Sequence, residues 1–94
     1  MNITKKDKIE RSQNVAQRLF EEQMLVINPK DSLLHRFNEV GTFIWQILDT
    51  PKTVEEICAA VKEHFEGVDD EQAFEDVTRF IIKLNEAKLV NINT

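Results

Sequence analysis

Three side chains in this sequence carry the groups that nucleophilic and acid–base catalysis use near neutral pH: Cys58, His35 and His64. A thiol beside an imidazole is an activated nucleophile in many enzymes. Cys58 and His64 lie six residues apart in one predicted helix, which places them on different faces of it. Cys58 falls on the apolar stripe of that helix, where a free thiol behaves as a small hydrophobic group. No cysteine–histidine nucleophile is therefore predicted.

Carboxylates are plentiful and could in principle form an acid–base pair or a metal site. They gather at predicted helix starts and on solvent faces, where the partial positive charge of a helix N-terminus stabilises them. The acidic run at residues 69–71 lacks the glycine and the final glutamate of a calcium loop. Gly41 and Gly67 do not form a phosphate-binding loop. We therefore predict no catalytic residue, no metal and no cofactor. The carboxylates considered are Glu55, Glu56, Glu63, Glu66, Asp69, Asp70 and Glu71.

The chain has 94 residues and a net charge of -5, a size that predicts one domain with one core. Basic residues gather near the N-terminus, and we expect residues 1–13 to form a flexible basic tail and residues 14–94 to form the domain. The body is acidic, which argues against nucleic acid as a partner. No segment predicts a membrane span or a signal peptide, and one cysteine fits a reducing compartment, so a cytoplasmic location is expected.

The first half of the domain has the residue pattern of short strands. Residues 15–20, 23–28 and 32–37 are rich in β-branched and apolar side chains. A glutamate pair separates the first two segments, and a turn-forming cluster at residues 28–31 precedes the third. This arrangement predicts a three-stranded antiparallel meander.

Three amphipathic helices are predicted after the strands. Each starts at a residue whose side chain can cap free backbone amides, and the second start has the Thr53 and Glu56 pair of a capping box. Apolar residues then recur at spacings of three and four. Pro51 ends the first helix, because proline disfavours the helical conformation of the residue before it. The expected helices run from Asn38 to about Asp49, from Thr53 to Gly67 and from Asp69 to about Ala87, and Leu89, Val90 and Ile92 are left to fill the core or to add a short strand. Strands followed by three short helices predict an α+β domain of the winged helix-turn-helix type.

Phe80 lies one step away from the core stripe of the third helix, which consists of Phe74, Val77, Ile81 and Leu84. Phe80 either widens the buried face or lines a groove beside the third strand. In the second case an extended peptide could pair with the strand edge and place its side chains against the helix.

The order and spacing of several motifs resemble the PqqD family, whose wider group comprises the precursor-peptide recognition elements of ribosomally synthesised, post-translationally modified peptides. The resemblance covers roughly residues 15–92. It departs from the family pattern at Phe37, where leucine is usual, and at Lys88, where glycine is common. The matching motifs are Phe37-Asn38-Glu39-Val40-Gly41, Ile44-Trp45, Ile47-Leu48-Asp49, Lys52-Thr53-Val54-Glu55-Glu56-Ile57, Asp76-Val77, Phe80-Ile81 with Leu84, and Lys88-Leu89-Val90.

The resemblance implies a non-catalytic peptide chaperone that captures the leader segment of a precursor peptide. The leader would add as a strand to the third strand, pack against the third helix and be presented to a tailoring enzyme, often a radical S-adenosylmethionine protein. The pathway could make pyrroloquinoline quinone or another modified peptide. Carried onto this sequence, the implied peptide-binding residues are Ser32, Leu33, Leu34, His35, Arg36, Asp76, Arg79, Phe80 and Lys83.

Two other functions stay open at this point. The same helices could form a winged-helix DNA-binding protein, although acidic residues on the third helix would face phosphates. The domain could also serve as a structural oligomerisation module, because an unpaired third strand can pair with its own copy to form a homodimer.

Overall fold

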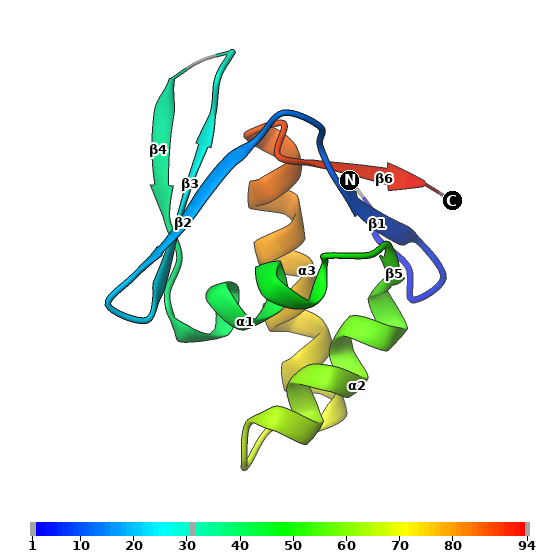
Figure 1. Ribbon diagram of the computed structural model, residues 1–94. Coiled ribbons are helices and arrows are strands. Elements are labelled where there is room, and N and C mark those ends of the chain that lie inside the picture. Colours follow the sequence, from blue (N-terminus) through cyan, green and yellow to red (C-terminus); the bar gives the residue numbers. More distant parts are fainter. Residues whose placement is uncertain (1, 31, 94) are drawn as a thin grey trace.

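The structure is a computed structural model that describes residues 2–30 and 32–93. Within these residues it contains three helices and two three-stranded sheets (Figure 1). Helix α3 crosses the middle of the molecule, with strands β2, β3 and β4 on one side and β1, β5 and β6 on the other. The elements are β1 (Lys8–Arg11), β2 (Ala16–Phe20), β3 (Gln23–Asn28), β4 (Leu33–Arg36), α1 (Glu39–Ile47), β5 (Lys52–Thr53), α2 (Val54–His64), α3 (Asp70–Glu86) and β6 (Val90–Asn93).

The predicted meander is confirmed as the antiparallel sheet β2-β3-β4. Its first turn consists of Glu21 and Glu22, both in the left-handed region with φ of 50° and 68°. A two-residue turn with two such residues has the twist that joins adjacent antiparallel strands well. The glutamate pair is therefore the hairpin turn itself. Residue 31 of the second predicted turn lies outside the described residues.

The helix starts predicted from capping residues are confirmed. The side chain of Asn38 accepts a hydrogen bond from the Gly41 amide (2.8 Å), and that of Asp69 accepts one from the Gln72 amide (2.8 Å). Thr53 forms a full capping box with its partner glutamate. Each interaction satisfies a backbone donor that the helix leaves free.

The expectation of a flexible tail over residues 1–13 is wrong for residues 8–11. These residues form β1, which is the central strand of the sheet β5-β1-β6 and pairs antiparallel with β6 from Lys8–Asn93 to Arg11–Val90. Ile9 is fully buried. The strand was missed because Ile9 is its only apolar residue, so no alternating pattern is visible in the sequence.

Trp45 belongs to the core and is fully buried. Its indole nitrogen donates to the side-chain oxygen of Gln17 in β2. The Arg11 guanidinium lies 4.6 Å from the centre of the Trp45 ring and donates to the Trp45 carbonyl oxygen. Burial lowers the pKa of Arg11, and nearby Asp49 opposes this change. Trp45 thus links helix α1 to both sheets, through Gln17 in β2 and through Arg11 in β1.

We predict that Ile9→Ala lowers the free energy of unfolding by about 2–5 kcal/mol, because it removes a fully buried side chain from the middle of a sheet. Urea titration followed by circular dichroism measures this change. The exposed neighbour Lys8 provides the matched control, and Lys8→Ala should change the value by less than about 0.5 kcal/mol. Equal stability of the Ile9→Ala variant and the wild type would show that β1 contributes nothing to the core.

Candidate peptide-binding site

Strand β4 is an edge strand of its sheet. It pairs with β3 along one side, from Leu25–Arg36 to Asn28–Leu33, and the sheet order gives it no neighbour on the other side among the described residues. Alternate residues of a strand point to opposite faces, so Leu34 and Arg36 lie on the solvent face and His35 lies on the inner face. Along this open side, the backbone groups of residues 34–36 are available to another strand.

Phe80 lies on α3 beside this edge and is half-buried. Its ring meets that of Phe37 edge-on, with 5.0 Å between the ring centres and an angle of 88°. Helix α1 approaches so closely that a methyl group at Gly41 would lie 2.9 Å from Cε1 of Phe80. Phe80 therefore packs against the core and also faces the groove, and the two alternatives drawn from its sequence position both hold in part.

Two hollows flank Phe80. The larger, of about 420 Å³, lies between β4 and the C-terminal half of α3. The smaller, of about 230 Å³, lies between the start of α1 and α3. Asn38, Phe80 and Lys83 line both, and we call the two hollows together the groove. The larger is lined by Leu34, His35, Arg36, Phe37, Asn38, Phe80, Lys83, Leu84, Ala87 and Leu89, and the smaller by Asn38, Val40, Gly41, Asp76, Arg79, Phe80 and Lys83.

Seven of the nine residues implied by the resemblance therefore line one continuous region: three from β4 and four from α3. Ser32 and Leu33 do not line it. Ser32 precedes β4 with a left-handed φ of 59°, and Leu33 is exposed at the first position of the strand. The sequence reasoning also missed lining residues such as Phe37 and Leu84. Their apolar spacing marks them as core, and they are both core residues and walls of the groove.

Among the described residues, the groove carries three cations, Arg36, Arg79 and Lys83, and one of them is already paired. Arg79 forms ion pairs with Glu75 (2.7 Å) and Asp76 (3.6 Å) on its own helix. Arg36 and Lys83 have no ion pair within the described residues. These two side chains are therefore the cations of the groove whose charge is available to a bound group.

His35 has a buried polar atom without a partner. Its Nε2 atom is covered and makes no hydrogen bond, while the rest of the residue lines the larger hollow. An unsatisfied buried nitrogen costs free energy.

Cys58 and His64, two of the groups considered for catalysis, have surroundings that the structure describes. Cys58 is buried, and burial raises the pKa of its thiol, which disfavours the reactive thiolate. His64 stacks on Phe43 with 4.2 Å between the ring centres. No group of three or more metal-binding side chains occurs within the part of the chain that the structure describes. Within the same residues, no helix is long and apolar enough to cross a membrane.

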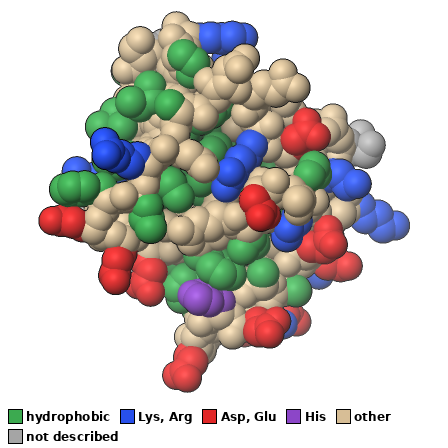
Figure 2. Space-filling model, in the orientation of Figure 1, with side chains coloured by type: hydrophobic (Ala, Val, Ile, Leu, Met, Phe, Trp, Pro, Cys, Tyr) green, Lys and Arg blue, Asp and Glu red, His purple; other side chains and the backbone are tan. Residues whose placement is uncertain are grey.

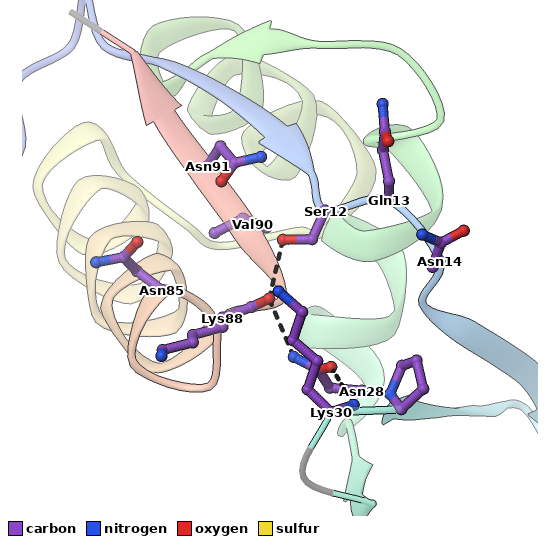
Figure 3. Close-up of a pocket in the computed structure, with 10 residues that line it drawn as sticks. Ser12, Gln13, Asn14, Asn28, Lys30, Asn85, Lys88, Val90 and Asn91 are labelled. Carbon is purple, nitrogen blue, oxygen red and sulfur yellow. Dashed lines mark hydrogen bonds between the residues drawn. The ribbon is translucent and has the colours of Figure 1, made fainter.

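A further hollow, of about 630 Å³, is larger than the two beside Phe80 and lies among polar side chains around the end of α3 and the loop after β1 (Figure 3). The carbonyl oxygen of Lys88 accepts hydrogen bonds there from Ser12 (2.9 Å) and from the buried side chain of Asn28 (3.3 Å). The Asn28 amide also donates to the Ala87 carbonyl (3.2 Å). None of the predicted site residues lines this hollow. The hydrogen bonds of Asn28 join the end of β3 to the residues that follow α3.

Two solved structures share this fold. The first, described as TbiB1 in complex with the TbiA(beta) leader peptide, has a TM-score of 0.80 and 22% sequence identity, and the alignment covers 87% of this chain and 94% of that one. The second, lasso peptide synthetase B1 complexed with the leader peptide, has a TM-score of 0.75 and 14% identity, with 88% and 96% of the two chains covered.

Residues 23–90 match the family described as coenzyme PQQ synthesis protein D (PqqD), and this chain belongs to that family. The match confirms the resemblance seen in the sequence motifs. No curated protein matches the chain significantly.

We predict that Gly41→Ala displaces the ring of Phe80, because the added methyl group would overlap it. Nuclear magnetic resonance of the aromatic protons should show new shifts for Phe80 and Phe37. The free energy of unfolding should fall by less than about 2 kcal/mol, since overpacking costs about 1–3 kcal/mol and the better helix former returns about 1 kcal/mol. The double variant Gly41→Ala/Phe80→Leu is the control and should regain stability. Unmoved ring resonances in Gly41→Ala would contradict the close packing.

Proposed function

We propose that this protein binds the leader segment of a ribosomally made precursor peptide in the groove between β4 and α3. The observation that carries the proposal is the open edge of β4 beside the hollow of about 420 Å³. Membership of the PqqD family supports it, and so do the two structures of the same fold, whose descriptions name a bound leader peptide.

The physical basis of binding has two parts. A peptide strand added to β4 forms main-chain hydrogen bonds that any sequence can make, which gives affinity without much selectivity. Selectivity then comes from peptide side chains that pack against Phe80 and from peptide charges that face Arg36 and Lys83. The groove requires no chemistry from the protein, and the proposed role is non-catalytic.

The chemistry would belong to a tailoring enzyme that receives the bound precursor. We propose a radical S-adenosylmethionine protein as the class to test first, with pyrroloquinoline quinone or another modified peptide as the product. The protein would hold one part of the precursor while the enzyme modifies another part.

The DNA-binding alternative lacks comparable support. Glu71, Glu75 and Glu86 are exposed on α3, the helix that would enter the major groove. Carboxylates on that surface oppose binding to the phosphate backbone, which depends on clustered cations.

We predict that the neighbouring genes encode a short precursor peptide and that this peptide binds the protein with micromolar or tighter affinity, measured by isothermal titration calorimetry. Phe80→Ala should weaken binding by about 1–3 kcal/mol if the ring is a central anchor. Glu86→Ala, on an exposed position of the same helix, is the matched control and should bind like the wild type.

Amide resonances identify the location of binding. The peptide should shift the amides of residues 33–37 and 76–84 and leave those of α2 unchanged. Absence of binding would contradict the proposed function. Shifts confined to surfaces away from β4 and α3 would contradict binding in the groove. A dimer that pairs through β4 in the absence of peptide would show that self-association competes with peptide binding.

A further inference from the structure

The solvent face of the β2-β3-β4 sheet carries an unusual number of exposed apolar side chains. Ile27 and Leu34 are 38% and 57% exposed, and Phe20 is 55% exposed. In Figure 2, hydrophobic side chains gather with basic ones over the part of the surface formed by this sheet. Large exposed apolar patches on small proteins commonly mark interaction sites.

The register of the sheet orders these side chains into two rows. Ile27 pairs with Ala16 on one side and with Leu34 on the other, which makes an apolar row. The adjacent row is basic at both ends, because Leu25 pairs with Arg18 and Arg36. Neither arginine has an ion pair within the described residues. Both rows end at the open edge of β4.

A strand that pairs with β4 would extend each row by one residue. The peptide residue opposite Leu34 would join the apolar row, and the residue opposite Arg36 would join the basic row, because directly opposed residues share a face of the sheet. The residue between them would be opposite His35 and would point to the inner face, where Phe37, Phe80 and the larger hollow lie.

The chemistry of each position follows from its neighbours. An apolar side chain beside Leu34 removes more apolar surface from water. A carboxylate beside Arg36 forms a favourable cross-strand pair, and a second basic residue there would be repelled. The inner position faces mainly aromatic and aliphatic groups, including Leu84 and Leu89, so an apolar side chain suits it.

The direction of the added strand sets the order of these residues. The sheet is antiparallel throughout, and purely antiparallel sheets are favoured over mixed ones. In an antiparallel strand the peptide residues opposite Arg36, His35 and Leu34 follow one another from N- to C-terminus.

We propose that the bound peptide contains an acidic residue followed by two apolar residues, read by Arg36, the inner hollow and Leu34 in that order. The inference rests on the proposed function and adds to it: the solvent face of the sheet, as well as the groove, selects the peptide. The peptide's second apolar residue would then pack beside Leu34, at the β4 end of the exposed apolar row.

The test is selection of random decapeptides, displayed on messenger RNA, against immobilised protein. The wild type should enrich peptides in which an acidic residue is followed by two apolar residues. Arg36→Glu should change the preference at the first position from acidic to basic, and Leu34→Ser should remove the apolar preference two positions later. Each change should leave the other positions of the motif intact. Lys6→Glu is the control, because it makes the same charge change at an exposed site outside this sheet.

A selected peptide then gives the magnitudes. Replacing its acidic residue by lysine should weaken binding to the wild type by about two- to fivefold, the range expected of a cross-strand charge pair, and Arg36→Glu should restore it.

The outcomes separate this inference from the proposed function. If no peptide is enriched by the wild type, the proposed function fails and this inference fails with it. If peptides are enriched but their preferences ignore Arg36 and Leu34, peptide binding stands and the reading by the solvent face is overturned. A wild type that sediments as a dimer, and a Leu34→Ser variant that does not, would assign the apolar face to a second copy and overturn the inference.

Discussion

The contact on which the rest of the structure depends is made by Phe37, the residue that follows β4. Its amide donates to the Met24 carbonyl in β3 (3.0 Å), and its carbonyl accepts from the Thr42 hydroxyl in α1 (3.3 Å). Its ring contacts Phe80 on α3 and lies 5.7 Å from that of Trp45. One residue therefore fixes the end of β4 to a strand and two helices. Because β4 is held at this end, its outer side can stay open without the strand detaching.

An open strand edge can pair with a second copy of the protein, and the arginine side chains of the edge strands oppose this pairing. Both β2 and β4 are edges, and each carries an arginine on its solvent face. A second copy paired antiparallel about the middle of β2 would place Arg18 opposite its own counterpart, which is repulsive. Arg36 likewise places a positive charge near the end of β4, which opposes pairing of this edge with a second copy. Of these two arginines, only Arg36 lies on β4, where the proposed peptide would pair, so its charge would both oppose a second copy and favour an acidic residue of the peptide.

Local signals in the sequence predicted most of the elements, because caps and apolar periodicity act over a few residues. Asn38, Thr53 and Asp69 marked their helices correctly. Strand β1 could not be found in this way, since Ile9 gains its burial from a partner strand at the other end of the chain. The groove was predictable only in outline for the same reason. Phe37 looks like a core residue in the sequence, and only the tertiary structure shows that its other side lines the groove.

The pairing of β1 with β6 brings the two ends of the described chain together in one sheet, with Lys8 opposite Asn93. Figure 1 shows this sheet on the opposite side of α3 from β4. A polypeptide joined to either end would leave the molecule away from the groove and would not cross a peptide bound there. The topology is therefore compatible with fusion to a larger enzyme and with circular permutation through a short linker. In either architecture the recognition surface would keep its access to solvent.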